Sequence, residues 1–436
     1  MKTSTTCTPT RRFQKGVTMI EMIVVMFIFS IFIMLLANSF GTIMKYSSRF
    51  TKGEESNIEG VVGLEMLRHD IESAGYGLAT SFSNNVNPTY LEATTAPPNL
   101  LNDAGMAPPL PRAIVGLGGK TGMLNTATNV GSDGSTYTTL AGSDYLTIKS
   151  ASLGIQDTQQ KWTYITYSSV PAPPKVWTSG NLINGDQVIV LRRSIASSGL
   201  ADYQLVFNPG TPNNYWTTFA SAGLPPIYSP ATASDINYVY GIAASGNLGM
   251  PFNRADYFVA TPNTGATTGN LPVYCAPHTG ILYKALVNHA DGKLLYQPIL
   301  DCVARMQVVL GWSMLDSGGN VITSSSILGT GAIDTWTSVD GNQVSSSGGV
   351  TRAQMIAALA DPGQIRTKLK VVKIYILAQN GKLDTSYTSL SSYNLYDPLV
   401  EGSTPGSTYT LTSDMLNYRW KVYELMVRPK NLQSNQ

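Results

Sequence analysis

The stretch QKGVTMIEMIVVMFIFSIFIMLLANSF, residues 14–40, decides the first part of the fold. From Val17 to Ala37 there are 21 residues, and this apolar run is interrupted only by two hydroxyl-bearing residues and by Glu21. As a helix it spans about 31 Å, at about 1.5 Å per residue, which matches the hydrocarbon core of a bilayer. The run therefore predicts a membrane-spanning helix over 17–37 that contains one ionisable carboxylate.

A carboxylate inside the apolar part of a membrane is costly and indicates a cationic partner at the same depth. No Lys or Arg lies between residues 17 and 44. Cleavage of the chain just before Val17 would create an α-amino group, which supplies the missing positive charge. Residues 1–16 carry four basic residues and no acidic one, as a leader segment does. Cleavage at this point and the position of Glu21 explain each other.

At these residues the chain resembles the type IV pilins and pseudopilins. The sequence KGVTMIE looks like their class III signal: a basic leader, Gly, the cut, an apolar residue, Thr, two apolar residues and Glu. The resemblance implies that a prepilin peptidase cuts between Gly16 and Val17 and methylates the new amine of Val17. It also implies that Glu21 pairs with the methylated amine of a neighbouring subunit. Val17 stands where the family usually has Phe.

The helical pattern continues well beyond the apolar run. Four apolar residues stand three to four apart, as a helix with one buried stripe requires, at Val61, Leu64, Leu67 and Ile71. We therefore expect one long helix from Thr18 to Ala74, with its second half packed on a globular head. Gly53 and Gly60 are expected to let this helix bend or loosen.

The stretch LEMLRHDIESAGYGL, residues 64–78, resembles the end of the helix in PilW-type minor pilins and J-type pseudopilins. The residues that carry this resemblance are Arg68, Asp70, Ala74, Gly75 and Tyr76. Gly75 suits the position after a helix that needs a positive φ, and Tyr76 is then expected to fold back onto the helix. Arg68 and Asp70 are two residues apart and do not face each other, so each is expected to pair elsewhere.

From about residue 79 the sequence changes to polar loops with short β-like runs between them. The clearest predicted strands are 144–150, 161–167, 186–193, 202–208, 304–312, 368–378 and 418–427. In 368–378 one face is apolar, whereas the other face mixes Lys373 with apolar residues. The chain ends in VRPKNL (427–432), in which Arg428 and Asn431 are an inexact match to the Arg-Asn ending of PilW-type proteins.

The expected fold class is therefore α+β and type IV pilin-like, with a long N-terminal helix packed on a large antiparallel β-rich head. The expected divisions are a leader (1–16), the helix (17–78) and the head (79–436). Within the head, residues around 79–300 match no family motif and are interpreted as a large insertion.

The composition and the cysteines bear on chemistry. Cys275 and Cys302 are an even pair outside the leader, expected to form a disulfide, the alternative being two buried thiols. The segment CAPHTG (275–280) would also admit Cys275 as a nucleophile beside His278, a less favoured interpretation.

The three histidines lack metal-ligand spacing, and the loop LDSGGN (315–320) is expected to be a turn rather than a calcium site. We expect no enzyme activity, no metal and no cofactor.

The charge balance argues against nucleic acid as a partner. Without the four basic residues of the leader, the chain has 25 basic and 27 acidic residues, so no basic field remains. By resemblance, the expected partners are prepilin peptidase, an inner-membrane assembly platform, other minor pilins, the major pilin and a large tip adhesin. The chain would sit in the inner membrane with its head in the periplasm, and then in the pilus at the cell surface.

Two other functions stay open on the sequence alone. One is a J-type pseudopilin of a type II secretion system, whose head is usually much smaller. The other is a secreted carbohydrate-binding or hydrolytic β-protein released by ordinary signal peptidase, with a mature N-terminus at Phe40.

The substitution Gly16→Val tests the cleavage signal. We expect the variant to keep its leader, because the peptidase of this family cuts after Gly, whereas Glu21→Val should still be cleaved. Mass spectrometry of the membrane-bound chain measures both. A Gly16→Val chain that loses residues 1–16 normally would contradict the assignment.

Overall fold

The structure is a computed structural model that describes part of the chain. The described residues are 16, 18–83, 87–119, 131–132, 134–168, 173–195, 199, 201–207, 215–233, 235–263 and 270–433. They form two compact units, one that ends at Glu54 and one that begins at Glu55. The predicted α+β class is confirmed, because an apolar N-terminal helix precedes a large β-rich domain of antiparallel sheets.

The helix α1 (Met19–Ser73) closely follows the range predicted from the sequence. Within it, Met19–Gly41 is long and apolar enough to cross a membrane. All side chains from Thr18 to Gly41 are exposed, including large aliphatic and aromatic ones. A helix with apolar side chains on all sides suits a lipid or helical-bundle environment rather than water.

The C-terminal turns of α1 pack into the head through Leu67 and Ile71, which are fully buried. Val61 was predicted to share this stripe, but it is 62% exposed, so that part of the prediction is wrong. Gly63 takes the inward position instead, where a Cβ would lie 2.0 Å from Cγ2 of Ile299. Gly60 likewise lies in the continuous helix against Tyr423, so it allows close packing and introduces no break.

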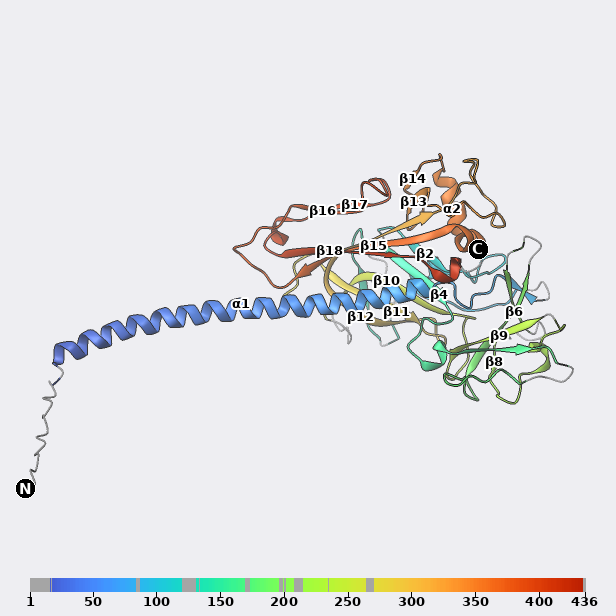
Figure 1. Cartoon of the computed structure of the whole chain (residues 1–436), viewed down its shortest axis with the longest axis horizontal. Helices are drawn as coiled ribbons and strands as arrows, with labels where there is room; N and C mark the ends of the chain where they lie inside the picture. Colours follow the sequence, from blue (N-terminus) through green and yellow to red (C-terminus); the bar gives the residue numbers. More distant parts are fainter. Residues whose placement is uncertain are drawn as a thin grey trace, which may run out of the picture. The chain divides into compact units, whose positions relative to one another are not determined.

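The larger sheet of the head has ten strands, and β12 (Leu294–Trp312) is its longest. Figure 1 shows β15 (Leu369–Asn380) beside β18 (Arg419–Val427), and β15 pairs in turn with β12. The other side of β12 pairs with β11 (Gly280–Val287), followed by β10 (Asn253–Pro262). The remaining strands of this sheet are β2 (Ile114–Leu117), β3 (Tyr137–Thr139), β4 (Tyr145–Ser150), β13 (Thr335–Ser338) and β14 (Val344–Ser346).

The smaller sheet has six strands, and its centre is β6 (Gln187–Ile195) between β7 (Ala201–Leu205) and β9 (Ile236–Ala243). Its other strands are β1 (Ser81–Phe82), β5 (Trp162–Thr166) and β8 (Thr217–Thr218). Its strands are antiparallel except for the pair β1–β7. The strands of residues 79–300 thus divide between the two sheets, and the interpretation of this range as an insertion stays a prediction.

Outside the two sheets, the described chain forms a hairpin, three short α-helices and several 3-10 turns. The hairpin is β16 (Ser392–Leu395) with β17 (Ser407–Thr410). The helices are α2 (Arg352–Ala360), α3 (Pro362–Lys368) and α4 (Lys430–Gln433).

The seven strands predicted from the sequence are present as β4, β5, β6, β7, β12, β15 and β18. In β15 the predicted alternation is also present, since Val372 and Ile374 belong to the main core and Val371 and Tyr375 to a second core. Lys373 on this second face is buried, and its Nζ lies 2.7 Å from a carboxylate oxygen of Glu401. The face of β15 that mixes Lys373 with apolar residues is therefore buried in the second core, and the charge of Lys373 is paired with Glu401.

The strands β9, β10 and β11 were not predicted, and β10 shows why. It carries Arg254 and Asp256 in the fully buried interior, where they pair at 2.9 Å. Arg254 also bonds to Glu92 at 3.1 Å, and Glu92 in turn lies 2.6 Å from Nζ of Lys149 on β4. Buried charges survive when they are paired and hydrogen-bonded, as here. In the sequence, however, they interrupt the apolar pattern of a core strand.

Asn253, at the start of β10, connects the two sheets. Its side-chain amide donates to the carbonyl oxygens of Ala151, at 2.7 Å, and of Ile242 on β9, at 3.3 Å. Its Oδ1 lies 3.1 Å from Nε2 of His289, while Nδ1 of that ring is buried without a hydrogen-bond partner among the residues described. Burial lowers the pKa of His289 to about 4. This histidine is thus neutral in the folded head.

We expect His289 to make a contribution to the stability of the head that is lost as the pH drops from about 6.5 to about 4. His289 takes up a proton in the unfolded chain at its ordinary pKa, whereas in the fold it does so only near its lowered pKa of about 4. The contribution of neutral His289 to the stability of the head is therefore complete above the pKa of His289 in the unfolded chain, and it is lost as the pH falls below that value. Thermal unfolding of the full chain in detergent at several pH values measures this. His289→Gln retains a donor for Asn253 but does not titrate, so the stability of the native chain relative to this variant should fall over this pH range. A difference that stays constant with pH would contradict the assignment.

Candidate functional site

The N-terminal end of α1 holds the residues predicted to be processed. Gly16 and Thr18 are exposed, whereas Val17 lies outside the described residues. The backbone amide of Thr18 donates to Oε2 of Glu21 at 2.9 Å, and the Thr18 hydroxyl donates to the same oxygen at 3.0 Å. The amide of Glu21 donates back to the Thr18 hydroxyl at 3.4 Å. This reciprocal arrangement is a capping box, which begins the helix at the residue after the cap.

The capping box leaves Glu21 able to accept a further donor. Both bonds from Thr18 end on Oε2, and Glu21 has no cationic partner in the part of the chain that the structure describes. Among the described residues, Oε1 of Glu21 has no hydrogen-bond donor. A carboxylate oriented by its own helix cap is held in one place, so the entropy lost on pairing is small.

The other end of α1 contains the residues that resemble the PilW-type helix end. Arg68 lies 2.7 Å from Glu65 and 3.2 Å from Glu72 on the exposed side of the helix. Asp70 points the other way and is 4% exposed. As predicted, Arg68 and Asp70 have different partners.

Asp70 fixes the helix to two strands of the larger sheet. Its Oδ2 accepts a hydrogen bond of 2.6 Å from the hydroxyl of Tyr257 on β10 and lies 2.6 Å from Nζ of Lys284 on β11. Burial and the neighbouring Asp70 carboxylate raise the pKa of Tyr257, which keeps this phenol protonated as the donor. Helix and sheet are thus joined by a buried charged group with two donors.

Gly75 turns the chain out of the helix with φ of 83°, in the left-handed region that was predicted for it. Its amide donates to the carbonyl oxygen of Lys149 at 3.0 Å, so the turn that ends α1 is hydrogen-bonded to β4. Tyr76 does not fold back onto the helix, and that prediction is wrong. Its ring lies edge-on to Tyr240 of β9 with centroids 5.2 Å apart, because the chain has already turned toward the smaller sheet.

The C-terminal segment closes over the same helix end. Nδ2 of Asn431 donates to the carbonyl oxygen of Glu72 at 3.2 Å, and Nζ of Lys430 lies 2.6 Å from the Glu72 carboxylate. A helix leaves its last carbonyl groups without partners, and Asn431 supplies one donor. The two stretches that resemble PilW-type proteins, near residue 70 and near residue 430, therefore meet in space.

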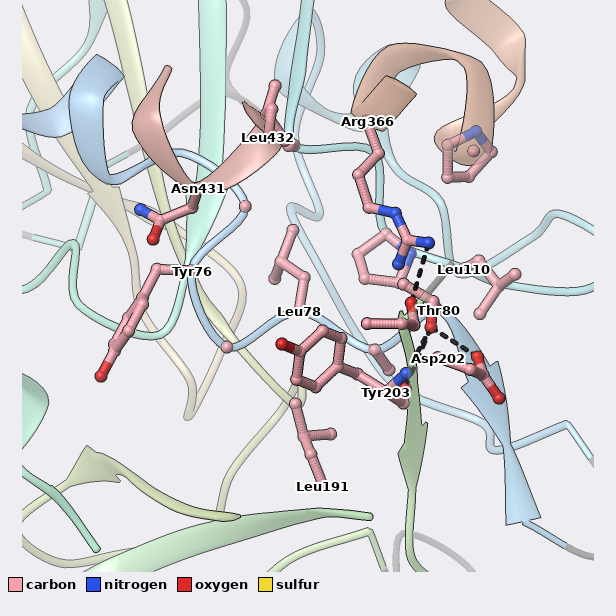
Figure 2. A pocket seen from close by; sticks show the side chains of 18 of the residues that line it. Tyr76, Leu78, Thr80, Leu110, Leu191, Asp202, Tyr203, Arg366, Asn431 and Leu432 are labelled. Atoms are coloured by element: carbon pink, nitrogen blue, oxygen red, sulfur yellow. Dashed lines mark hydrogen bonds between the residues drawn. The ribbon is translucent and has the colours of Figure 1, made fainter. Parts of the chain in front are cut away.

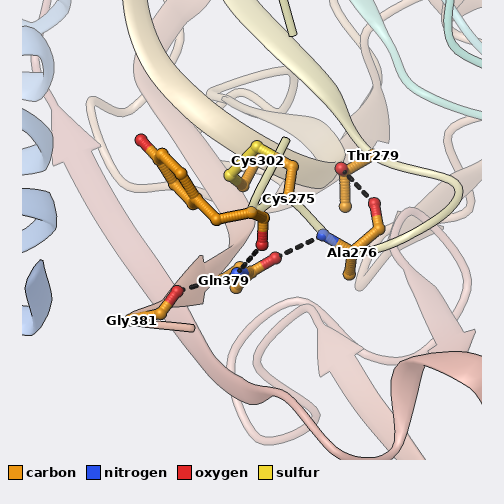
Figure 3. The surroundings of a disulfide bond; sticks show 7 residues. Cys275, Ala276, Thr279, Cys302, Gln379 and Gly381 are labelled. Carbon is orange, nitrogen blue, oxygen red and sulfur yellow. Dashed lines mark hydrogen bonds between the residues drawn. A yellow bond between two sulfur atoms is a disulfide. The ribbon is translucent and has the colours of Figure 1, made fainter. Parts of the chain in front are cut away.

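Cys275 and Cys302 form the predicted disulfide. It fastens the loop before β11 to β12, and Figure 3 shows Gln379 of β15 bonded to the same loop. Oε1 of Gln379 accepts from the amide of Ala276 at 2.6 Å, and its Nε2 donates to the Tyr274 carbonyl at 2.9 Å. A disulfide sulfur is not a thiolate, so Cys275 is not the nucleophile of the alternative interpretation.

The described residues contain no group of three His, Cys, Asp or Glu arranged to hold a metal ion. His69 is exposed on α1, and the exposed His278 ring lies 3.5 Å from Asp414. In the loop 315–320, the Asp316 carboxylate accepts the amides of Gly318 and Asn320, at 2.8 and 2.9 Å, as a turn does.

Comparison with known proteins assigns the N-terminal segment. Residues 11–37 match the family model described as the prokaryotic N-terminal methylation motif. No curated protein and no solved structure matched the chain. The match contains Gly16, Val17 and Glu21 together with the start of α1, and it supports a type IV pilin-like or pseudopilin protein. Pilin-type assembly, with a peptidase and other pilins as partners and membrane anchoring before assembly, follows from this class.

The sequence did not predict the partners of Asp70. Lys284 and Tyr257 lie about 200 residues away in the chain, on strands that were not predicted, and no local pattern connects them to the helix. The one available signal was Asp70 itself, an acidic residue one position before the apolar Ile71 on the packed side of the helix.

We expect Lys284→Met to lower the free energy of unfolding of the head by about 3–5 kcal/mol, because it leaves the Asp70 carboxylate buried without a cation. Asp70→Leu combined with Lys284→Met removes both charges and should recover at least half of this loss. Arg68→Met, in exposed ion pairs, should cost only about 0–1 kcal/mol.

Urea unfolding of the full chain in detergent, followed by tryptophan fluorescence, compares the three variants. Equal losses in the single and the double variant would show that the charge pair does not hold the helix to the sheet.

Proposed function

We propose that this protein is a minor pilin of a type IV pilus, of the PilW type. In this proposal residues 1–16 are a leader, the cut falls between Gly16 and Val17, and prepilin peptidase methylates the amine of Val17. The mature chain spans the inner membrane by residues 17–37, with its head, 79–436, in the periplasm. It then joins the complex that primes the filament and remains at its tip.

The observation that carries the proposal is the methylation motif at residues 11–37, which continues without interruption into α1. The oriented carboxylate of Glu21 supports it, because that group needs a cation that the apolar segment does not contain. The methylated amine of a neighbouring subunit would be that cation. Pairing two charges that would otherwise be unpaired in an apolar bundle also sets the axial register of the subunits.

The size of the head favours the pilus over a type II secretion pseudopilin. Its strands begin at Ser81 and end at Val427, and they build two separate sheets, whereas J-type heads are usually much smaller. The meeting of α1 with Asn431 at the head's C-terminal end supports the PilW resemblance at both stretches. The partners in this proposal are other minor pilins, the major pilin, the inner-membrane assembly platform and a large tip adhesin.

We expect Glu21→Val to be processed normally but to reach sheared pili at a level at least about tenfold lower, equivalent to about 1.4 kcal/mol of lost association. Immunoblots of the sheared and membrane fractions measure both steps. Ser30→Ala is the matched control, since the Ser30 hydroxyl already donates to the Phe27 carbonyl at 2.8 Å within its own helix. Normal incorporation of Glu21→Val would refute the role of the carboxylate in assembly.

A further inference from the structure

The head contains a cavity of about 390 Å³ where the segment after α1 meets the smaller sheet, α3 and α4. Figure 2 shows Leu78 and Thr80 from that segment, Leu191 and Tyr203 from β6 and β7, and Arg366 from α3 around it. Its volume is in the range of pockets that bind small molecules, about 300–1,000 Å³. It lies within the second compact unit and contains no part of the N-terminal processing segment.

Arg366 gives this cavity an incompletely compensated positive charge. Its Nη2 donates to the carbonyl oxygen of Ala201 at 3.1 Å, while Nε and Nη1 are buried without hydrogen-bond partners in the described chain. The nearby Asp202 carboxylate is occupied by the hydroxyls of Thr80, at 2.6 Å, and Ser81, at 2.9 Å. Burial lowers the pKa of Arg366, and Asp202 offsets this only in part. A buried guanidinium with unused donors favours an arriving anion.

Three tyrosines supply the other polar groups. Tyr76, Tyr203 and Tyr240 line the cavity, and their hydroxyls have no hydrogen-bond partner among the residues that the structure places. The rings of Tyr76 and Tyr240 lie edge-on with their centroids 5.2 Å apart. All three can donate and accept, and their ring faces and edges are apolar. Leu78, Leu110 and Leu191 complete an apolar wall.

We propose that this cavity binds a sugar acid, such as one hexuronic acid unit of an acidic polysaccharide. The carboxylate would be attracted by Arg366, the ring hydroxyls would bond to the tyrosine hydroxyls, and the apolar face of the sugar ring would pack on tyrosine and leucine side chains. A neutral sugar lacks the charge that Arg366 favours. A peptide carboxylate lacks the several hydroxyls that the three phenols lining the cavity would satisfy. This binding goes beyond the proposed pilus function and does not require assembly.

Isothermal titration of glucuronate into the full chain in detergent micelles tests the proposal. We expect glucuronate to bind at least about tenfold more tightly than glucose, and Arg366→Gln to weaken it about tenfold. Arg366→Lys keeps the charge and should retain part of the affinity. Tyr203→Phe keeps the ring but removes one hydroxyl, and should weaken binding about two- to fivefold.

Arg192→Gln is the matched control. Arg192 also has a buried Nε without a partner in the described chain, on the same smaller sheet, but it does not line the cavity. The Arg192→Gln variant should bind glucuronate as the native chain does. Thermal unfolding of each variant checks that it is folded. No glucuronate binding up to about 10 mM, equal affinity for glucose, or tighter binding of N-acetyltyrosine or inorganic phosphate would each overturn the proposal.

Discussion

The buried carboxylate of Asp70 is the contact on which the head depends. It takes a hydrogen bond from Tyr257 on β10 and an ion pair from Lys284 on β11, and so holds the last turns of α1 against two strands of the larger sheet. Hydrophobic contacts through Leu67 and Ile71 are not directional, whereas a buried charge with two donors fixes one rotation of the helix. The position of the chain segments after α1 depends on this rotation of the helix about its axis.

Once the helix is fixed, its end becomes the point where the rest of the head meets. The amide of Gly75 bonds to β4, and the ring of Tyr76 contacts Tyr240 on β9 of the smaller sheet. Asn431, from the last helix of the head, donates to a carbonyl group at the end of α1. The cavity of Arg366 lies beside this junction and is built from the same segments. The end of α1 and the cavity proposed to bind a ligand are therefore adjacent.

The sequence predicted the elements whose pattern is local. The apolar run up to Ala37, the long helix and the alternating strand β15 follow from periodicities of 3.6 and 2 residues, which depend only on neighbouring side chains. The disulfide followed from two cysteines outside the leader. Gly75 at positive φ followed from its position after a helix.

Long-range pairing accounts for what the sequence did not predict. Arg254, Asp256 and Lys284 make β10 and β11 look like surface segments, and only partners distant in the chain make these residues tolerable in a core. Tyr76 was misplaced for the same reason, since its neighbour Tyr240 belongs to a strand that no local pattern revealed. The cavity, likewise, is assembled from segments that lie far apart in the sequence.

We propose that the mature chain begins at Val17, whose amine provides the charge that Glu21 needs. Mass spectrometry of the N-terminal peptide of the native protein from membranes tests it most directly. We expect a peptide that begins at Val17 and carries one added methyl group on its amine. An intact leader, or a mature N-terminus at Phe40 produced by ordinary signal peptidase, would contradict it.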